Sequence, residues 1–377
     1  MKKLLILPIF VFAFPLFLLA QSTATEWFDK GVSLIDKKDF TGAISAFKNA
    51  IAQKADYGDA YYQTGWCYND LEKYQDAVTY LEKAKQLLPE KAKVHFELGY
   101  TYDNLKNPDK ALINYQKSLD ISPDYYDACK AIGDIYYTKN EYKKAAEYFK
   151  KYADGEKEPD NFYYYKTGWS LSDIGEYEDA ITYLEKYNPE ETLDKVKKYS
   201  EIGYANYSLK KYDAAIEFYK KAIDLKDDYG IALRGLGNSY YDKNENDQAF
   251  DYYKQAIEKD EANSGSCYYK MGWIYNDHEK YDEAISVLLK AVAFDGKDAG
   301  NREELGFAYY KKDRYDDAID QLNKAIELDP KSKLGYYYKG LCYISLKKKS
   351  DAMNMYDKLK AINEDQASKL LVKINAM

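Results

Sequence analysis

The chain has 377 residues, of which 46% are hydrophobic, 31% are charged and only 8 are proline, which excludes a disordered chain and suits a folded, helix-rich protein. The formal net charge of −8 disfavours partners with dense negative charge, namely nucleic acids and anionic membrane surfaces. Tyrosine is unusually frequent, with 44 residues.

The first twenty residues have the pattern of an export signal. A short basic start at Lys2 and Lys3 precedes an apolar stretch over residues 4–20, and a polar stretch follows. We expect cleavage after Ala20. The alternative is an uncleaved anchor, because 17 apolar residues are barely enough to span a bilayer.

This segment predicts an exported protein, periplasmic, cell-surface or secreted, in a bacterial setting. Pro8 and Pro15 interrupt a regular helix and favour the signal over the anchor. Cleavage would remove Lys2 and Lys3 and take the net charge from −8 to −10. Membrane contact is expected only through this segment, and only if it is retained.

Glycines recur at a nearly constant interval along the rest of the chain. Six successive gaps are 34 residues long and three are 35, which indicates a unit copied about ten times and stacked into an array. The ladder glycines are Gly31, Gly65, Gly99, Gly133, Gly168, Gly203, Gly237, Gly272, Gly306 and Gly340.

A second ladder lies twelve residues after the first. It consists of Ala43, Ala77, Ala111, Ala145, Ala180, Ala215, Ala249, Ala284, Ala318 and Ala352. Two small residues at a fixed separation, each within an apolar pattern of period 3.6, predict two helices whose backbones approach closely there. Since glycine inside a helix costs about 1 kcal/mol relative to alanine, close packing must offset that cost.

Two further positions complete the unit. An aromatic residue follows most ladder glycines by three positions, as in Tyr68 and Tyr102, and a bulky residue follows each ladder alanine by four, as in Phe47 and Leu81. The unit resembles the tetratricopeptide repeat, a 34-residue helix-turn-helix, over residues 24–363. The resemblance implies an all-α fold, an α-solenoid with right-handed superhelical twist built of about ten repeats.

Two local features modify this array. Each 35-residue gap places its extra residue between an alanine and the next glycine, in the second helix or in the turn between units. Residues 364–377 place Ala367, Leu370, Leu371 and Ile374 on one helical face, which predicts a capping helix over the last unit.

A longer period of three units is superimposed on the array. The segments Tyr61–Trp66, Tyr164–Trp169 and Tyr268–Trp273 match one another better than they match their neighbours, at spacings of 103 and 104 residues. Units three, six and nine also form a group, with Glu97-Leu98-Gly99-Tyr100, Glu201-Ile202-Gly203-Tyr204 and Glu304-Leu305-Gly306-Phe307. The array therefore reads as a triplicated three-unit block behind one extra unit.

The three-unit period supplies the candidate binding residues. A tyrosine and a tryptophan four apart share one helix face, and by resemblance that face lines the concave groove. The alternative that these rings only pack against the neighbouring unit stays open. The groove candidates are Tyr62, Trp66, Asn69, Tyr100, Tyr165, Trp169, Ser172, Tyr204, Tyr269, Trp273, Asn276 and Phe307.

The four cysteines are expected to be unpaired and mostly buried. Cys67, Cys129, Cys267 and Cys342 fall in the second, fourth, eighth and tenth units. Non-adjacent units of a solenoid do not touch, whereas a disulfide needs Cα atoms within about 7 Å.

Catalytic and metal-binding patterns are weak. His95 and His278 are the only histidines, and neither has a cysteine or second histidine at ligand spacing. Arg234 and Asn238 match part of the carboxylate-binding site of cytosolic tetratricopeptide co-chaperones, but the following units do not supply the remaining residues. We therefore expect no enzyme activity, no cofactor and no metal.

The sequence thus predicts a non-enzymatic, exported interaction scaffold that binds a protein or an extended peptide in its concave groove. The alternative is binding of envelope polysaccharide or peptidoglycan, in which Trp66, Trp169 and Trp273 stack on sugar rings. No motif identifies the partner.

Overall fold

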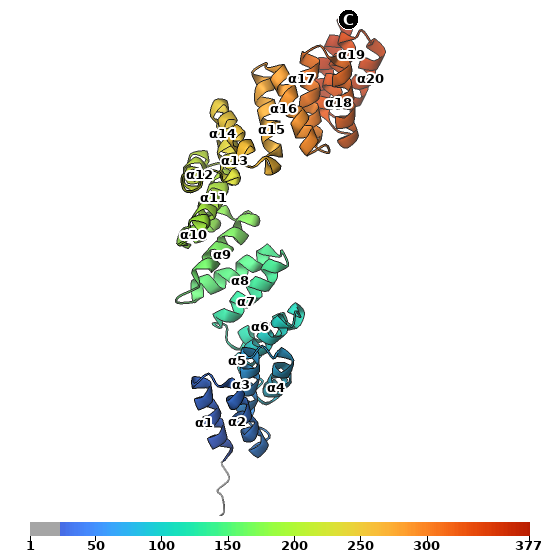
Figure 1. Ribbon diagram of the computed structural model, residues 1–377. Helices are drawn as coiled ribbons and strands as arrows, with labels where there is room; N and C mark the ends of the chain where they lie inside the picture. Colours follow the sequence, from blue (N-terminus) through green and yellow to red (C-terminus); the bar gives the residue numbers. More distant parts are fainter. Residues whose placement is uncertain (1–22) are drawn as a thin grey trace, which may run out of the picture. The chain divides into compact units, whose positions relative to one another are not determined.

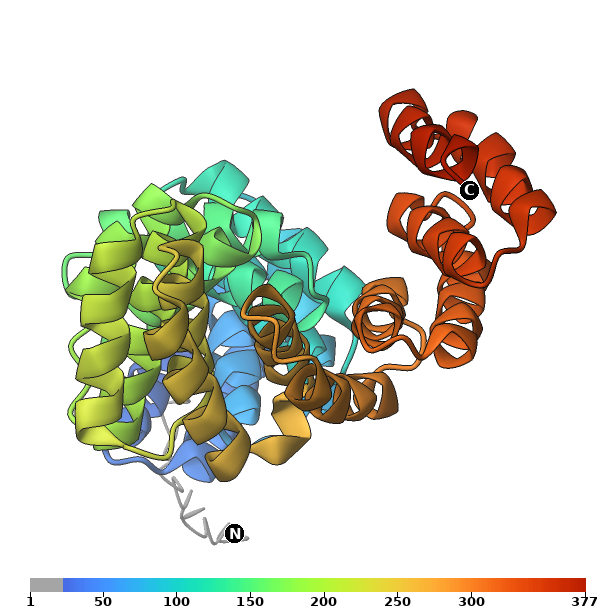
Figure 2. The same ribbon diagram turned by 90° about the horizontal axis from the view of Figure 1, so that it is seen from above.

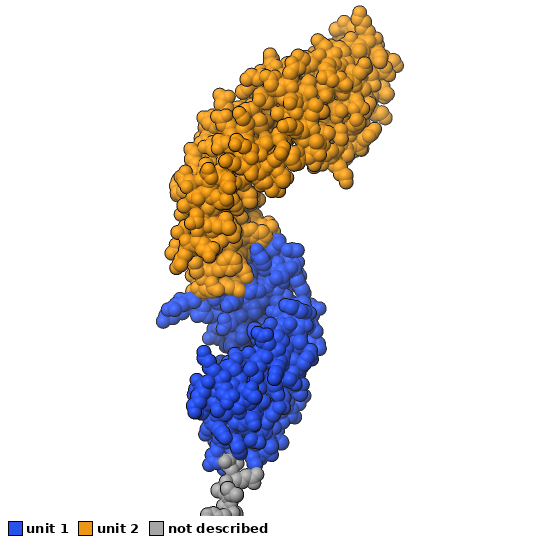
Figure 3. All heavy atoms as spheres, in the orientation of Figure 1, with its two compact units in different colours: residues 1–158 blue, residues 159–377 orange. Residues whose placement is uncertain are grey.

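The computed structural model describes residues 23–377, so the expected export signal lies outside the described residues. Within residues 23–377 the chain forms 21 α-helices and one 3-10 helix and contains no strand, which confirms the all-α prediction. The chain divides into two compact units, one ending at Glu158 and one beginning at Pro159 (Figure 3).

From residue 23 onward the first unit contains four helix pairs, and the two helices of each pair lie side by side (Figure 1). The pairs are α1 (Ala24–Asp36) with α2 (Phe40–Gln53), α3 (Gly58–Asp70) with α4 (Tyr74–Leu87), α5 (Ala92–Asn104) with α6 (Pro108–Ile121), and α7 (Tyr126–Thr138) with α8 (Tyr142–Gly155).

The second unit contains six pairs and one further helix. They are α9 (Asn161–Asp173) with α10 (Tyr177–Lys186), α11 (Thr192–Ser208) with α12 (Tyr212–Leu225), α13 (Gly230–Asp242) with α14 (Asn246–Lys259), α15 (Gly265–Asp277) with α16 (Tyr281–Phe294), α17 (Ala299–Lys311) with α18 (Tyr315–Leu328), α19 (Lys333–Ser345) with α20 (Lys349–Lys360), and the single helix α21 (Glu364–Asn375).

The last helix packs on the last pair. Ala367, Leu370 and Ile374 of α21 are buried against Leu341 and Leu359 of α19 and α20. The C-terminal helices are drawn in red in Figure 2. Because α21 takes the place that a following repeat would occupy, the apolar face of the last pair is shielded from water.

The ladder glycines make room for side chains of the second helix. A Cβ atom on Gly65 would lie 2.5 Å from Leu81 Cγ, and one on Gly99 would lie 2.6 Å from Tyr115 Cδ1. In nine pairs the occupant is the bulky residue four positions after the ladder alanine. The last glycine, Gly340, instead faces Leu370 of α21. The expected close approach therefore occurs between glycine and this bulky side chain, while the ladder alanines are fully buried beside it.

The turn inside each pair has one repeated backbone feature. The residue seven positions after the ladder glycine has a positive φ in all ten pairs, and in nine of them it is not glycine. In the second pair Glu72 has a φ of 57°, and the next amide, of Lys73, donates to the carbonyl oxygen of Tyr68 at 2.8 Å. This 6→1 bond ends the first helix with a Schellman turn.

Gly175 allows a direct test of this turn. We expect Gly175→Ala to lower the free energy of unfolding by about 1 kcal/mol, because its φ of 83° disfavours any side chain while no atom lies within 4 Å of the added Cβ. Glu72→Gly should have the opposite sign and at most a similar size. Urea denaturation of each variant measures both changes, and two shifts of the same sign would contradict this account.

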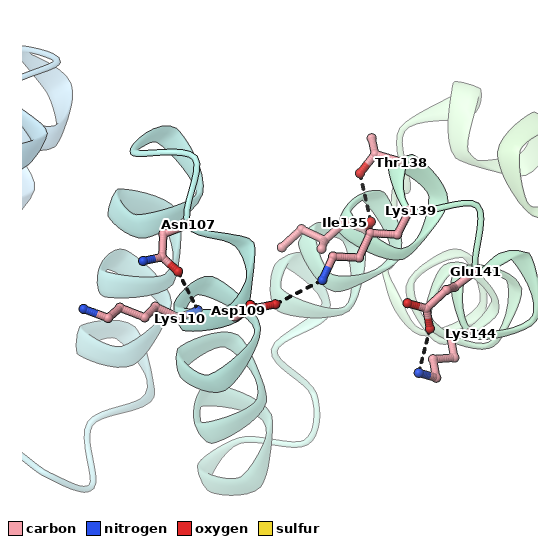
Figure 4. A network of polar contacts seen from close by, with 8 residues as sticks. All are labelled: Asn107, Asp109, Lys110, Ile135, Thr138, Lys139, Glu141 and Lys144. Carbon is pink, nitrogen blue, oxygen red and sulfur yellow. Dashed lines mark hydrogen bonds and ion pairs between the residues drawn. The ribbon is translucent and has the colours of Figure 1, made fainter.

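Ion pairs connect some successive pairs at the surface. Lys139 Nζ, at the end of α7, lies 3.1 Å from Asp109 Oδ1 at the start of α6 (Figure 4). Lys243 with Asp213 and Lys312 with Asp282 repeat this contact, both at 2.8 Å. The aspartate side chains are largely exposed to water, so each pair contributes about 0–1 kcal/mol.

The longer gaps in the glycine ladder fall in turns between pairs. The connections before α9, α11 and α15 each contain five residues, where the connection before α7 contains four. In the last of these the extra length forms the short helix η1 (Glu261–Asn263). Of the two sites predicted for the insertions, the structure selects the turn.

All four cysteines are buried and unpaired, as predicted. Burial raises the pKa of the Cys67 thiol to about 12 and that of Cys267 to about 11. A thiol whose pKa lies this far above neutral pH is almost entirely protonated and is therefore a poor nucleophile, which fits a role in packing.

Candidate functional site

The three-unit period of the sequence produces matching hollows in space. In the first unit a hollow of about 340 Å³ opens between α3 and α5 and extends to Asp127 of α7. Trp66 and Asn69 of α3 and Glu97 and Tyr100 of α5 line it. We call it the first hollow.

The second compact unit contains a similar hollow, whose lining residues lie 207 positions later in the chain. We call it the third hollow. The third hollow, of about 290 Å³, is lined by Trp273 and Asn276 of α15, Glu304 and Phe307 of α17, and Tyr338 of α19. Asp277, Glu279, Tyr281, Lys311 and Leu334 complete its wall. Tryptophan, asparagine and glutamate therefore meet a further aromatic ring twice, tyrosine in the first hollow and phenylalanine in the third.

The middle copy of the period is built differently. Its hollow, of about 340 Å³, lies beside α13 and is lined by Glu201 and Tyr204 of α11 together with Arg234 and Asn238. We call it the second hollow. Trp169 and Ser172 are not among its lining residues. Arg234 and Asn238 are both engaged, since Arg234 Nη1 donates to the Asn263 carbonyl at 2.6 Å and Asn238 Oδ1 accepts from Tyr253.

A half-buried glutamate occupies the same register in all three hollows. Asn69 Nδ2 donates to Glu97 Oε2 at 3.0 Å, and Asn276 Nδ2 donates to Glu304 Oε2 at 2.9 Å. Ser172 replaces this asparagine in the middle copy. Ser172 is 4% exposed, and its Oγ has no hydrogen-bond partner among the described residues.

Burial shifts the titration of these carboxyls. It raises the pKa of Glu97 to about 7, although the Asn69 amide opposes the shift. Burial alone raises the pKa of Glu201 to about 7. Burial likewise raises the pKa of Glu304 against the opposing amide of Asn276. Each hollow thus holds an acid whose negative charge is poorly solvated, and a bound cation would stabilise that charge.

The tryptophans of the first and third hollows have two roles. Trp66 contacts Phe40 of the preceding pair edge to face at 5.8 Å, and Trp273 contacts Tyr241 in the same way at 5.4 Å. Both rings are half-buried and also line their hollows. Each tryptophan ring therefore both packs on the preceding repeat and lines a hollow, so the two alternatives predicted from the sequence are not exclusive.

The predicted tyrosines lie apart from the tryptophans. Tyr62 packs on the core, with Lys91 Nζ 4.9 Å from its ring centre. Tyr165 stacks on Phe162 at 5.8 Å, and Tyr269 lines a separate hollow of about 330 Å³ between α15 and α17. The tyrosine and tryptophan four residues apart on one helix thus do not line a single surface hollow.

The aromatic residues of units three, six and nine are the accessible part of the set. Tyr100 is 41% exposed and Tyr204 is 45% exposed, whereas Phe307 is half-buried. A tyrosine of the preceding pair meets each ring nearly edge to face, at 6.4 Å for Tyr74 with Tyr100 and 6.2 Å for Tyr281 with Phe307.

Sequence reasoning overlooked the glutamates themselves. Glu97, Glu201 and Glu304 mark the three-unit period in the sequence, but the groove candidates comprise only aromatic residues, two asparagines and a serine. The available signal was a charged residue directly before the buried Leu98, Ile202 and Leu305, at one register in three units and on the same helix as the exposed ring.

Two kinds of feature are absent from residues 23–377. That part of the chain has no cluster of three or more histidine, cysteine, aspartate or glutamate side chains placed to hold a metal ion. It also has no helix with the length and apolar character needed to cross a membrane.

Comparison with known proteins gives consistent family matches. Sequence models of the tetratricopeptide repeat match residues 28–92, 92–125, 126–154, 163–188, 199–229, 234–299 and 304–332. No curated protein sequence matches the chain.

Several solved structures are similar over part or most of the chain. The TPR protein YrrB, described as having an unusual peptide-binding site, is 26% identical over 46% of this chain and 89% of its own, with a TM-score of 0.43. MamA from Desulfovibrio magneticus RS-1 is 20% identical over 46% of this chain and 97% of its own, also at 0.43. A chain of the Naa15/Naa10 complex bound to HypK-THB is 14% identical over 93% of this chain and 68% of its own, at 0.46.

Proposed function

The chain belongs to the tetratricopeptide repeat family, whose repeats form scaffolds for protein–protein interaction, and we propose that it is a non-enzymatic scaffold that binds a protein or an extended peptide through its three hollows. The observation that supports this proposal is that a half-buried glutamate and an accessible aromatic ring occur together in each hollow. Such a site can accept both apolar and hydrogen-bonding groups of a ligand.

The proposed mechanism is display by a preformed framework. The side chains that line each hollow come from helices that are held by buried glycine contacts, so their ordering cost is met on folding rather than on binding. Several weak contacts on one ligand then sum to a useful affinity, provided that the ligand can reach more than one hollow.

A variant lacking the exposed rings tests this proposal. We expect Tyr100→Ala, Tyr204→Ala and Phe307→Ala in one chain to abolish crosslinking of the partner in cells, detected by mass spectrometry, with little change in helical circular dichroism. Two of the three rings are more than 40% exposed, so their removal costs the fold little. Ile113→Ala is the control, because Ile113 is 69% exposed and lies outside all three hollows.

The same experiment separates the alternative ligand. The Trp66 and Trp273 rings are half-buried and line their hollows, which supports envelope polysaccharide or peptidoglycan as the second candidate ligand. Binding to purified cell-wall material that is lost in the triple variant, without any protein crosslink, would favour the glycan. An unchanged protein crosslink in the triple variant would contradict the proposal for all three hollows.

We also propose that the scaffold acts outside the cytoplasm of a bacterial cell, in the periplasm or at the cell surface. This rests on the sequence of residues 1–20 alone. Intact-mass measurement of the protein recovered from the envelope fraction distinguishes a chain that begins at Gln21 from one that retains the apolar segment. Recovery only from the cytoplasm would contradict export.

A further inference from the structure

The exposed face of α6 carries an apolar residue that the other nine pairs lack. Ile113 lies two positions after the ladder alanine Ala111 and is 69% exposed. The corresponding residue of every other pair is polar, namely Ser45, Thr79, Glu147, Thr182, Glu217, Asp251, Ser286, Asp320 and Asn354. The array therefore keeps this register in contact with water everywhere except on α6.

Apolar surface continues beside Ile113. A hollow of about 550 Å³ opens between α6 and α7, and Leu112, Ile113, Ile132 and Tyr136 form its apolar lining. This volume exceeds that of each of the three hollows described above. A protruding apolar side chain next to an apolar hollow is typical of a surface that contacts another protein.

The charged residues around Ile113 are sorted by sign onto two flanks of α6. At about 100° per residue, Lys110 and Lys117 lie on one side of Ile113, and Asp109 and Asp120 lie on the other. Lys110 and Asp109 accordingly point to opposite sides of the helix (Figure 4). Lys110 and Asp120 have no ion-pair partner among residues 23–377. We call the two sides the basic flank and the acidic flank.

Contacts within the chain agree with this division. Lys117 Nζ lies 4.0 Å from Glu90 Oε1 in the turn before α5, so the basic flank is turned toward the preceding pair. Asp109 Oδ1 lies 3.1 Å from Lys139 Nζ at the end of α7, so the acidic flank is turned toward the following pair. The side chains of Lys117 and Asp109 are 43% and 85% exposed, which leaves both accessible to a further charged group.

This charge distribution is complementary to a second copy of itself. When two copies of α6 lie parallel and face to face, the basic flank of each helix meets the acidic flank of the other. An antiparallel arrangement would bring flanks of like charge together, which is unfavourable. In the parallel arrangement the two Ile113 side chains also meet at the centre of the contact.

We propose that two copies of this chain associate through α6, with the two helices parallel and related by a twofold axis. Ile113 of each copy packs on Ile113 of the other. The ammonium groups of Lys110 and Lys117 meet the carboxylates of Asp109 and Asp120 across the axis, and the alkyl stems of the lysines cover the hollow beside α7. This face lies apart from the three hollows, so the inference does not depend on the proposed function.

The size of the contact predicts a weak dimer. A contact through one helix of 14 residues is small compared with the roughly 800 Å² per partner of a stable interface. We therefore expect a dissociation constant of about 10–100 μM.

Sedimentation equilibrium of the full chain at about 5–500 μM measures this association. We expect Ile113→Thr, which introduces the residue that α4 has at this register, to raise the dissociation constant at least about tenfold. Helical circular dichroism should stay unchanged, because the side chain is 69% exposed. Glu147→Thr at the same register of α8 is the matched control and should change the constant by less than about twofold.

Charge reversal tests the parallel orientation. One variant carries Lys110→Glu and Lys117→Glu, and a second carries Asp109→Lys and Asp120→Lys. Each should associate with itself at least about tenfold more weakly than the wild type, because both of its flanks then have the same sign. An equimolar mixture of the two should form a heterodimer with a dissociation constant within about threefold of the wild-type value.

The next pair supplies a matched control for charge reversal. Lys144 and Lys151 occupy on α8 the registers that Lys110 and Lys117 occupy on α6, and both are exposed. Lys144→Glu with Lys151→Glu therefore changes the net charge equally without touching the proposed contact. At about 0.15 M salt, which screens charges beyond about 8 Å, we expect less than a twofold change in self-association.

A cysteine placed at the centre of the contact reports the geometry directly. Ile113→Cys should give a covalent dimer with a short bismaleimide, because the two copies of this position face each other across the axis. The four native cysteines are buried and do not compete for the reagent. Glu147→Cys, at the same register of α8, should remain uncrosslinked.

Each result supports or overturns the inference. A wild-type chain that is monomeric at about 500 μM, an Ile113→Thr variant that dimerises as strongly as the wild type, or charge variants that fail to associate in the mixture would each overturn it. If the wild type is monomeric and Ile113→Thr instead loses a partner that crosslinks in cells, the face binds a different protein and the inference is wrong. A dimer lost in Ile113→Thr while the cellular partner still crosslinks supports both proposals, and the same loss without any crosslinked partner supports the dimer alone.

Discussion

Replacing Glu201 with glutamine is expected to raise the free energy of unfolding at about pH 8 by about 2–3 kcal/mol. The carboxyl lies half-buried on α11, and burial raises its pKa from the ordinary 4.5 to about 7. The ionised form is therefore poorly solvated in the folded chain. Glutamine occupies nearly the same volume without the charge, so the variant loses the penalty and keeps the packing.

The sign of the pH dependence follows from the shift. Between about pH 4.5 and pH 7 the folded chain holds more protons at this site than the unfolded chain does, so stability falls as pH rises through this window. Below about pH 4.5 both states are protonated, and the substitution should have almost no effect. Hydrogen exchange of α11 amides at low and high pH measures the local change, because long repeat arrays need not unfold in two states.

The matched control for this prediction is Glu217→Gln on the neighbouring helix α12. Glu217 is exposed and pairs with Lys221 at 2.6 Å, so its removal should change stability by less than about 0.5 kcal/mol. Equal effects of the two substitutions at high pH would show that Glu201 is not specifically destabilised by burial. If the Glu201→Gln variant is the more stable one, the glutamate that recurs in all three hollows destabilises the fold, as expected of a residue kept for binding at the expense of stability.

Gly306→Ala is expected to lower the free energy of unfolding by about 2 kcal/mol, although alanine is the better helix former by about 1 kcal/mol. The added Cβ would lie 2.7 Å from Leu322 Cγ and 2.8 Å from its Cδ2. Leu322 is fully buried and cannot move aside without displacing α18 from α17. Overpacking therefore exceeds the gain in helix propensity.

Gly300→Ala in the same helix is the control. Its Cβ would meet Asp298 Oδ1 at 3.0 Å and Tyr269 Oη at 3.7 Å, both polar ends of side chains and not a packed core side chain. We expect a change within about 0.5 kcal/mol. Urea denaturation followed by tryptophan fluorescence compares the two, and a Gly306→Ala variant as stable as Gly300→Ala would contradict the packing role of the ladder.

Much of the fold could be predicted because it depends on local periodicity. The Gly65–Leu81 type of contact occurs between neighbouring helices and recurs at one period, so each repeat confirms the register of the next. The positive φ at Glu72 was harder to predict from the sequence, because nine pairs have a polar residue other than glycine at this turn position. Only the backbone hydrogen bonds reveal that feature.

The candidate site was predicted only in part. Trp66, Asn69 and Tyr100 do meet in one hollow, and Trp273, Asn276 and Phe307 meet in another. The middle set does not repeat this arrangement, because the second hollow lies beside α13. Spacing along the chain places residues on a helix face, but the packing of the next pair decides which of them stay accessible.

By itself the sequence determined the repeat, its helix pairs, the burial of the cysteines and the three-unit period, because each depends on the order of small and bulky residues along a regular helix. Only the tertiary structure decided which groups face each other across adjacent pairs. The hydrogen bonds from Asn69 to Glu97 and from Asn276 to Glu304, the burial of Glu201 and the unsatisfied oxygen of Asn276 all result from the packing of neighbouring helix pairs. Their burial and hydrogen bonding are properties of that packing, and no one-dimensional pattern contains them.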